Sequence, residues 1–463
     1  MAWDTPLNLL RAEVTQRRDE GCEIPGELCS RIDALTDGQD DYDLSRVDPL
    51  YDELMALPQD TALAAREPND LAAIRASRPE GPRDLGCQAN DDELLDRLHG
   101  AWTGRALGCA LGKPVEGLGM SRDASGRVVG RLAIRAYLEA RGDWPLSDFF
   151  SGRDAGDGVS LWCPQSQREN IAFMEPDDDI HYSLVALAVL ERAGPDFTWQ
   201  DVGRCWLERI PTFAICTAEA QAIENLQTRS TRPGYWSCAA TPAFTRRHRN
   251  PYREWIGAQI RADGWGWACA GKPELAAELA YRDASWTHER NGIYGEMMFA
   301  AIQAAAFVER DPKRLVEIGL SEIPRACRLA EWTRTCLGWL DAGASLESCV
   351  ERVEAALCPM SAVHTINNAL VCVAALVRAG VEPTQAALAA VSMGHDTDCN
   401  GATVGSIAGA ATGRAGFGGR LAARLNDTVR PSMIGFQEVS MTELARRTLA
   451  QVKVVAAYHR ARG

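Results

Sequence analysis

The chain has 463 residues, of which 46% are hydrophobic, and this length and composition predict a globular protein with a large core and two or three structural units. Acidic residues outnumber basic ones by 63 to 49, and the formal net charge of -14 argues against a general nucleic-acid-binding or anionic-membrane surface. The fifteen cysteines include no Cys-x-x-Cys pair, so we expect buried thiols and neither a disulfide framework nor a zinc knuckle. The N-terminal sequence shows no charged-then-apolar leader, and we therefore expect a cytoplasmic protein.

The first ninety residues predict several short helices, with an acidic patch over residues 37–54. They end in "RPEGPRDLGCQAND", from Arg78 to Asp91, whose proline, glycine and polar residues predict a linker or a surface crossing. We therefore divide the chain into an N-terminal helical extension, residues 1–90, and a larger unit, residues 91–463.

The larger unit contains long alanine- and leucine-rich segments with helical spacing, several of which stop at a glycine. They are residues 91–108, 181–194, 272–286 and 367–380. Alternating strand patterns of any length are scarce, so the sequence predicts an all-α fold.

An acidic cluster, "PDDDIHYSL", leads directly into one of these helices. Three adjacent carboxylates, Asp177, Asp178 and Asp179, repel one another, and burying even one of them without compensation is costly. A divalent cation with oxygen ligands would resolve that conflict. The alternative is a helix N-cap with extra surface charge.

The segment "GHDTDCNGATVGSIAGAATG", residues 394–413, places Asp396 and Asp398 at the start of a second such helix. Its glycines recur at every fourth position, at 401, 405, 409 and 413. Each glycine inside a helix costs about 1 kcal/mol relative to alanine, so this stripe predicts very close packing against another backbone. We expect this rigid helix and the 177–179 cluster to converge on one cation.

Several motifs resemble those of the ADP-ribosylglycohydrolase family. "GHDTDCNGATVGSIAGA" is similar to its Gly-x-Asp-Thr-Asp signature, "GAWTGRALGCALGKPVEG" to its first glycine-rich helix, and "PDDDIHYSL" to its Thr-Asp-Asp-Thr motif. "IGAQIRADGWGW" and "DASWTH" stand where the family has its central segments. The resemblance extends over about residues 92 to 440 in the family's order, and the first ninety residues lie outside it.

The resemblance implies a compact multi-helix fold around a binuclear site for two divalent cations, Mg²⁺ or Mn²⁺. It also implies hydrolysis of the bond that joins ADP-ribose to an acceptor. The metal-binding residues carried over are Asp177, Asp178, Asp179, Asp396, Asp398 and Cys399. Glu116 matches a glutamate that reaches the metals from a mobile loop in some members, and we expect it to act as the base beside Asp178 and Asp179.

The expected substrate-binding residues are His288, which matches a histidine near the ribose, and Arg261 and Gly264, which can meet a pyrophosphate. A packed core histidine is the alternative for His288, and in the segment of Arg261 and Gly264 the alternative is that Trp265 and Trp267 simply pack. We expect His181 and His395 to support the site without binding metal, and His364 to cap a helix. The basic run over residues 245–253 is either a solvated loop or an attractant for an anionic ligand.

Three positions depart from the family pattern. Cys109 stands in place of an aspartate, Asp177 in place of a threonine, and Cys399 in place of a threonine or serine. These changes leave the metal preference and the acceptor open.

The sequence therefore predicts a metal-dependent hydrolase whose substrate is an ADP-ribosylated protein or a ribosylated small molecule, with no nucleic-acid or membrane partner and an open oligomeric state. One alternative is an N-ribosyl hydrolase for a free nucleoside- or NAD-derived metabolite in a biosynthetic pathway. Another is a non-catalytic protein of the same fold that binds ADP-ribose or has a structural role.

Overall fold

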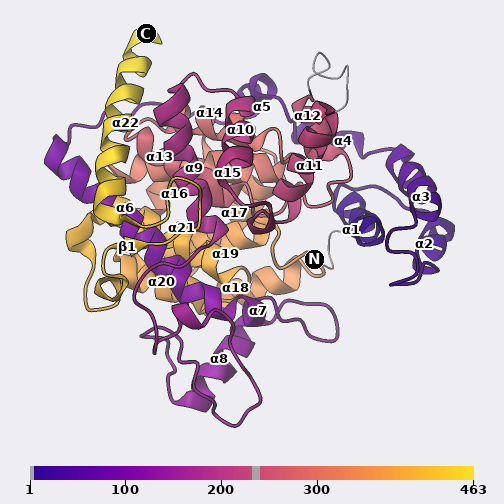
Figure 1. The fold of residues 1–463 in the computed structure, drawn as a ribbon, viewed down its shortest axis with the longest axis horizontal. Helices are drawn as coiled ribbons and strands as arrows, with labels where there is room; N and C mark the ends of the chain where they lie inside the picture. Colours follow the sequence, from indigo (N-terminus) through magenta and orange to yellow (C-terminus); the bar gives the residue numbers. More distant parts are fainter. Residues whose placement is uncertain (1–4, 232–239, 463) are drawn as a thin grey trace.

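The chain is almost entirely helical in the computed structural model, which describes residues 5–231 and 240–462 (Figure 1). One short antiparallel pair, β1 (Thr428–Val429) with β2 (Val439–Ser440), accounts for the strands of the described residues. Within the same residues no helix has the length and apolar character needed to cross a membrane. The all-α prediction is confirmed.

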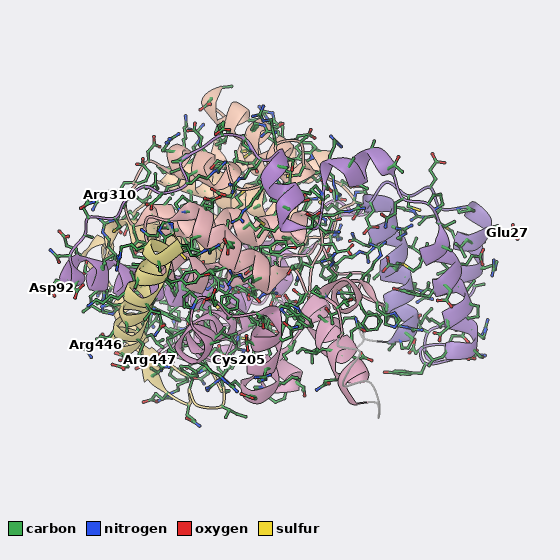
Figure 2. The ribbon with its side chains drawn as sticks, turned by 90° about the horizontal axis from the view of Figure 1, so that it is seen from above. Glu27, Asp92, Cys205, Arg310, Arg446 and Arg447 are labelled. Carbon is green, nitrogen blue, oxygen red and sulfur yellow. The ribbon has the colours of Figure 1, made fainter. Side chains whose placement is uncertain are left out.

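The first helices build a small core of their own at one side of the molecule (Figure 1). The helices before residue 90 are α1 (Pro6–Asp19), α2 (Gly26–Asp33), α3 (Leu44–Ala56), α4 (Thr61–Arg66) and α5 (Leu71–Ser77). Apolar side chains of α1, α2 and α3, such as Leu10, Leu28 and Leu54, are buried against one another. Figure 2 shows Glu27 of α2 at the opposite end of the molecule from Asp92.

The segment between residues 78 and 90 is irregular but is held against the main body. Arg78 donates a 2.6 Å hydrogen bond to Glu322, and Arg83 donates one of 2.8 Å to the same carboxylate. The backbone N–H of Leu85 donates to the carbonyl oxygen of Gly271. Of the two sequence interpretations, the surface crossing is confirmed.

The remaining helices pack around a large shared core. They are α6 (Asp91–Gly112), α7 (Glu116–Gly119), α8 (Gly130–Arg141), α9 (Asp178–Ala193), α10 (Trp199–Arg209), α11 (Thr217–Thr231), α12 (Pro242–Arg247), α13 (Ala262–Ala268), α14 (Pro273–Ala284), α15 (Asn291–Ala306), α16 (Pro312–Leu320), α17 (Arg328–Asp341), α18 (Leu346–Ala356), α19 (Thr365–Ala379), α20 (Pro383–Val391), α21 (Thr397–Thr412) and α22 (Met441–Arg462). Short 3-10 turns are η1 (Lys113–Val115), η2 (Pro164–Ser166), η3 (Thr212–Ala214), η5 (Gln259–Arg261), η6 (Arg414–Gly416) and η7 (Ala422–Leu425). The four helical segments predicted from sequence periodicity correspond to α6, α9, α14 and α19.

Two antiparallel glycine stripes bring α6 and α21 into backbone contact. The stripes are Gly100, Gly104, Gly108 and Gly112 on α6, and Gly401, Gly405 and Gly409 on α21. A Cβ atom at Gly104 would lie 2.0 Å from the carbonyl oxygen of Gly405, and one at Gly108 would lie 1.9 Å from that of Gly401. Any larger residue would force the helices apart, so the predicted close approach is confirmed; we call this contact the glycine seam.

Gly413 differs from the other predicted members of its stripe. It follows the last residue of α21 and has a φ of +76°, a left-handed conformation that suits glycine at a helix end. A Cβ atom there would meet the carboxylate of Asp96 on α6, and a Cβ atom on Gly100 of α6 would lie 2.5 Å from the backbone carbon of Gly413. Gly413 therefore continues the close packing against α6, as the spacing predicts, from a position just beyond the end of α21.

Candidate metal centre

Acidic side chains gather where three helix ends meet: the end of α6 and the starts of α9 and α21. Three sets of side chains each bring ligand-type atoms within 4.8 Å of one another, namely Cys109 with Asp177 and Asp179, Asp179 with Asp398 and Cys399, and Glu116 with Asp396 and Asp398. Asp179 and Asp398 each belong to two sets. The sets therefore form one continuous group of carboxylates, Asp177, Asp179, Asp398, Asp396 and Glu116, which we call the acidic row.

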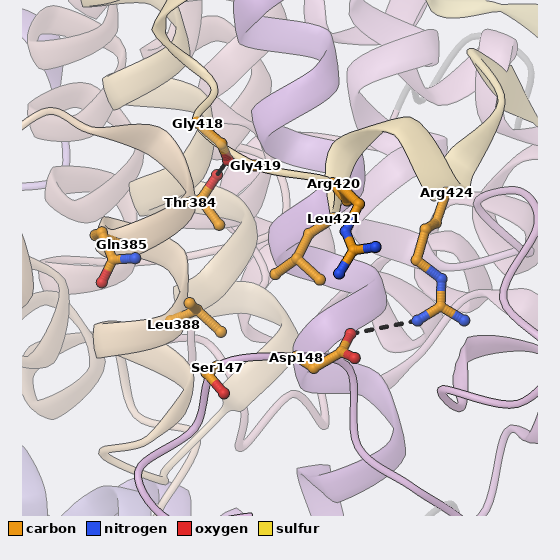
Figure 3. Close-up of a pocket in the computed structure, with 10 residues that line it drawn as sticks. All are labelled: Ser147, Asp148, Thr384, Gln385, Leu388, Gly418, Gly419, Arg420, Leu421 and Arg424. Carbon is orange, nitrogen blue, oxygen red and sulfur yellow. Dashed lines mark hydrogen bonds and ion pairs between the residues drawn. The ribbon is translucent and has the colours of Figure 1, made fainter.

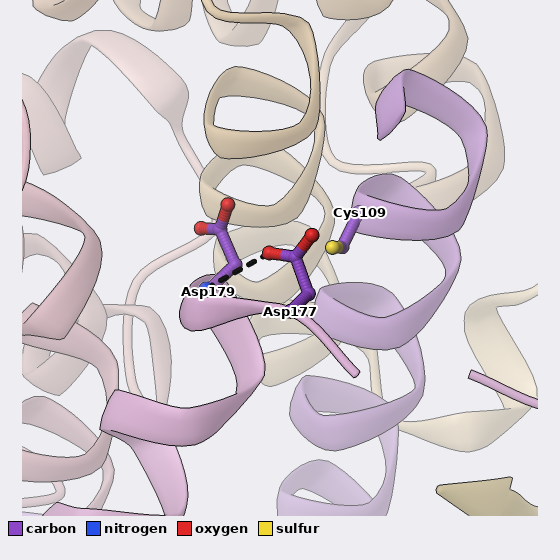
Figure 4. A group of neighbouring side chains, drawn as sticks. All are labelled: Cys109, Asp177 and Asp179. Carbon is purple, nitrogen blue, oxygen red and sulfur yellow. Dashed lines mark hydrogen bonds between the residues drawn. The ribbon is translucent and has the colours of Figure 1, made fainter. Parts of the chain in front are cut away.

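Local structure fixes each end of the row. Asp177 caps α9, and its carboxylate accepts a 3.0 Å hydrogen bond from the backbone N–H of Asp179. Asp396 precedes α21, and its own N–H donates to the side-chain oxygen of Asn368 at 3.1 Å. Both clusters thus lie at helix N-termini, where partial positive charge favours carboxylates. Figure 4 shows Cys109 of α6 pointing toward Asp177.

The glycine seam sets the distance between these ends. Gly112, the last glycine on the α6 side, lies so close to α21 that a Cβ there would be 2.3 Å from the backbone nitrogen of Asp398. The hydroxyl of Thr397 donates to the carbonyl oxygen of Gly112 at 2.8 Å. The end of α6 and the start of α21 are therefore in direct contact beside the row.

Three carboxylate oxygens in the row are buried without a hydrogen-bond partner in the described residues: Oδ2 of Asp179, Oδ1 of Asp396 and Oδ1 of Asp398. Buried polar atoms normally find partners, and an unpaired carboxylate oxygen is especially costly. Oxygen atoms of this kind are the donors that Mg²⁺ and Mn²⁺ prefer. The donor set fits a divalent cation.

The pKa values of the carboxyl groups in the row also favour a bound cation. Burial and the neighbouring carboxylates raise the pKa of Asp396, and the same two causes raise the pKa of Asp179 and of Glu116. They raise the pKa of Asp398 to about 6. In the absence of a cation, the row must therefore hold protons or bear strong repulsion.

Two basic side chains of the protein reach one end of the row. The ammonium of Lys113 lies 3.0 Å from Asp177, and burial would raise the pKa of that carboxyl, but this ammonium holds it below its ordinary value. Arg105 bonds to Asp179 and, at 2.9 Å, to Asp263. Within the described residues, Asp396, Asp398 and Glu116 have no basic partner. Negative charge is therefore concentrated at the Glu116 end.

Sequence reasoning missed these two basic residues. Lys113 stands three positions before Glu116 in "GKPVEG", and Arg105 is an isolated charge in a helix of small and apolar residues. An arginine in such a place needs a carboxylate partner, which is the signal that could have found it. Cys109, one of the departures from the family pattern, is also a neighbour of Asp177 and Asp179.

The structure brings most of the predicted metal ligands together. Asp177, Asp179, Asp396, Asp398 and Cys399 all belong to the three sets. Asp178 belongs to none of them and is partly exposed, although burial and the charges of Asp177 and Asp398 still raise its pKa. Both carboxylate oxygens of Asp177 already have protein partners, as its cap interpretation predicts.

The predicted substrate-binding residues lie within the protein interior. Arg261 is 1% exposed and pairs with Asp283 at 2.9 Å, with Glu296 at 3.3 Å, and with Glu219. A Cβ on Gly264 would lie 2.4 Å from that of Ala186, so this glycine allows close helix packing. These contacts explain both residues as core residues, and a role toward pyrophosphate stays a prediction.

The histidines are also buried. His288 contacts the hydroxyl of Thr287 at 2.8 Å, and burial lowers its pKa, which keeps it neutral; its role near a ribose stays a prediction. His364 caps α19 by accepting from the N–H of Ile366, so the capping prediction is confirmed. His395 and His181 belong to none of the three candidate sets.

The basic run at residues 245–253 fits neither sequence interpretation. Arg246 and Arg247 pair with Glu289, and Arg253 is fully buried with Glu13 and Glu20 of α1. Both a solvated loop and an open anion site are therefore wrong for these arginines, because carboxylates distant in the sequence already neutralise them.

A cavity of about 640 Å³ lies elsewhere, between α20 and the segment after α21 (Figure 3). Its residues include Thr384, Arg420 and Arg424, and Arg424 pairs with Asp148 at 3.3 Å. None of the predicted site residues lines it. The candidate centre is therefore defined by the acidic row and not by this cavity.

Residues 90–456 match the family described as ADP-ribosylglycohydrolase. A solved structure described as an ADP-ribosylglycohydrolase-related protein complex is 18% identical, with a TM-score of 0.50, and the match covers 78% of this chain and 99% of that one. At this identity the likeness concerns the fold alone. Curated proteins gave no match.

Proposed function

Because the chain belongs to the ADP-ribosylglycohydrolase family, we propose that it is a metal-dependent hydrolase that cleaves the glycosidic bond of an ADP-ribosylated or related ribosylated substrate. The family supports hydrolase activity of the glycohydrolase type. The substrate and the metal are parts of the proposal, as are the individual roles below.

The observation that carries the proposal is the Glu116 end of the acidic row. Asp396 and Asp398 each hold a buried oxygen without a partner, and neither has a basic neighbour in the part of the chain that the structure describes. A purely structural role would pair these charges, as the arginines of the interior do elsewhere. Unpaired buried carboxylates are suited to a cation that comes from outside the chain.

Asp179, Asp396 and Asp398 would hold the cations, with Cys399 beside them. Burial and the nearby carboxylates raise the pKa of the Cys399 thiol, so it stays neutral and is a weak ligand for a hard cation. Asp178 and Asp177 are the further predicted ligands. When bound, divalent cations in such a site orient sugar hydroxyls, lower the pKa of water and offset negative charge.

Glu116 is the proposed base. It is the only half-exposed member of its set with Asp396 and Asp398, so a water molecule and a substrate can reach it. Glu116 is the first residue of α7, on the segment that directly follows the end of α6. In the reaction it would accept a proton from the attacking water, while the aspartates stabilise positive charge that develops on the ribose.

The division of the chain also belongs to the proposal: residues 1–90 as an extension and 91–463 as the catalytic unit. Two observations support it. The family match begins at residue 90, and α1 to α3 share an apolar cluster that is separate from the main core.

One observation favours a non-catalytic alternative. Lys113 and Arg105 already neutralise part of the row, at Asp177 and Asp179, where a second cation would bind. A protein with one cation or none could bind ADP-ribose without hydrolysing it. Binding of ADP-ribose with no turnover of any ribosylated substrate would support this alternative.

The test is to replace Asp396 by alanine and, separately, Asp178. Each variant should stay folded, lose metal by elemental analysis and lose hydrolysis of an ADP-ribosylated substrate by about a thousandfold or more. Asp92→Ala, an exposed aspartate at the start of α6, is the matched control and should keep both properties. Unchanged metal content in both site variants would overturn the shared site.

A further inference from the structure

A second cavity, of about 260 Å³, lies between the extension and the main body. One face of α1 forms a wall of it through Ala12, Thr15, Gln16 and Asp19, which follow one another at helical spacing. The opposite wall is Arg122, Pro251, Trp255, Pro359 and Ser361. Pockets for whole drug-sized ligands are usually larger, about 300 to 1,000 Å³, so this cavity suits one part of a ligand.

Asp19 is the unusual residue of this pocket. Its carboxylate makes no hydrogen bond or ion pair with any residue that the structure describes. Burial, together with the nearby Glu254, raises its pKa to about 6, while Arg328 acts in the opposite direction. A partly buried carboxylate of this kind would gain from an N–H donor brought by a ligand.

Trp255 is the aromatic residue among those that line the pocket. It is half-buried and packs against Tyr252 with 4.5 Å between ring centroids. An indole face of this kind stacks on planar rings. Arg122 lies in the same wall, but its guanidinium donates to the carbonyl oxygens of Pro359 at 3.3 Å and Met360 at 2.9 Å. Its positive charge disfavours a cationic ligand, so the pocket favours a neutral ring that bears N–H groups.

Two segments of the pocket wall are linked to the candidate metal centre, one along the chain and one through hydrogen bonds. Arg122 follows Glu116 by six positions along the chain, just after α7. Ser361 precedes Ala362, whose carbonyl oxygen accepts from the side chain of Asn368 at 2.7 Å. The side-chain oxygen of the same Asn368 accepts from the N–H of Asp396. The pocket is thus joined to the acidic row through short stretches of chain.

We infer that α1 of the extension completes a specificity pocket for an amino-bearing heteroaromatic ring of the substrate, stacked on Trp255 and hydrogen-bonded to Asp19. This inference rests on the proposed function, since the ring is taken to belong to the same ribosylated substrate. It gives the extension a part in substrate selection, because four of the nine lining residues lie outside the family match.

The test uses the full chain with Mn²⁺ and two probes: ADP-ribose, and its analogue with hypoxanthine in place of adenine. Hypoxanthine lacks the exocyclic amino group. Calorimetry should show that the wild-type protein binds ADP-ribose about fivefold more tightly than the analogue, the effect of one hydrogen bond. Asp19→Asn should remove this preference, because an amide can also donate to the hypoxanthine oxygen.

A second variant fills the pocket without removing any contact. Thr15→Tyr, at an exposed position of the lining face of α1, should weaken ADP-ribose binding at least about tenfold by blocking the stacked ring. Arg18→Tyr, also exposed on α1 but outside the pocket, is the control and should bind both probes as the wild type does. Ribose 5-phosphate, which has no heteroaromatic base, should bind the wild type, Thr15→Tyr and Arg18→Tyr equally.

The outcomes separate the two proposals. If the wild type binds both nucleotide probes equally and Thr15→Tyr changes neither affinity, the pocket inference is overturned while the metal centre stands. If the wild type binds neither ADP-ribose nor ribose 5-phosphate in the presence of Mn²⁺, the proposed function itself is overturned.

Discussion

Two regions of this protein bury several carboxylates, and they treat them in opposite ways. Between the extension and the main body, Glu13 and Glu20 pair with Arg253 at 2.8 and 2.7 Å, all with fully buried side chains. Nearby, Arg328 bonds to Glu67 and Glu254 at 2.8 and 2.7 Å. In the acidic row, by contrast, carboxylates mainly face one another. The first region uses buried charge to join two parts of the chain, and the second retains unbalanced charge beside a half-exposed glutamate.

This difference indicates that the row is not an accident of packing. The chain buries arginines beside carboxylates where structure alone is needed. Where Asp396 and Asp398 meet Glu116, it supplies none among the described residues. The two regions should therefore respond differently when one carboxylate is removed.

The largest effect on stability is expected in the paired region. Glu13→Ala leaves Arg253 buried without its two-oxygen partner, and breaking a buried ion pair in this way costs about 3 to 5 kcal/mol of unfolding free energy. Urea denaturation measures the loss. Glu53→Ala removes a partner of the exposed Arg31 and should cost less than about 1 kcal/mol. Equal losses in the two variants would contradict the structural role of the buried pair.

The glycine seam should show the next largest effect. Gly108→Ala places a methyl group 1.9 Å from the carbonyl oxygen of Gly401, and overpacking of this kind costs about 1 to 3 kcal/mol. Affinity for Mn²⁺ should fall as well, because the end of α6 moves relative to Asp398. Gly338→Ala, in an exposed part of α17 with open space around it, should instead be neutral or stabilising. Thermal unfolding and metal titration of both variants check this.

Removing a carboxylate from the row should stabilise the metal-free protein. Asp398→Asn takes away a buried charge that its neighbours repel, and we expect a gain of about 1 to 2 kcal/mol in EDTA. With saturating Mn²⁺ the order should reverse, because only the wild type gains binding energy from the ion. Melting curves under both conditions give the answer. If Mn²⁺ does not stabilise the wild-type protein, the acidic row does not bind the metal and the contrast drawn between the two regions is wrong.

The smallest effect concerns Cys399, whose thiol lies in the set with Asp179 and Asp398. Cys399→Thr replaces a weak, soft ligand by a hydroxyl that suits a hard cation, so activity with Mg²⁺ relative to Mn²⁺ should rise a few-fold. The ratio of the two rates is the measurement. An unchanged ratio accompanied by a changed melting temperature would show that the thiol only packs within the helix contact.

Sequence patterns predicted the parts of this structure that depend on local spacing. Apolar periodicity indicated α6, α9, α14 and α19, and the glycine spacing indicated a backbone contact along α21. The two aspartate clusters, each at the start of a helix, lie close together, and their convergence on one cation stays a prediction. Gly413 continues the same spacing at the C-cap of α21, where its backbone packs against Gly100 of α6.

The remainder depends on contacts between residues far apart in the chain. Arg253 pairs with Glu13, which lies 240 positions away in the sequence, so the basic run by itself gives no sign that this arginine is buried. Arg261 is neutralised by Glu219, Asp283 and Glu296, which no local motif connects. The sequence does not show which carboxylate pairs with a given arginine, because only the fold brings the two side chains together. The roles of the arginines therefore depend on the structure more than those of the aspartates do.

The glycine seam has a consequence for how such a centre can evolve. Because the contact between α6 and α21 is made by main-chain atoms, the positions of residues 109 and 398 do not depend on which side chains they carry. Substitution at a ligand position then changes the chemistry offered to a cation and leaves the frame that presents it intact. Cys109 and Cys399 stand at two positions of this kind, beside the carboxylates of the acidic row. Single substitutions at such positions can therefore change the preferred metal and the range of substrates while the fold stays the same.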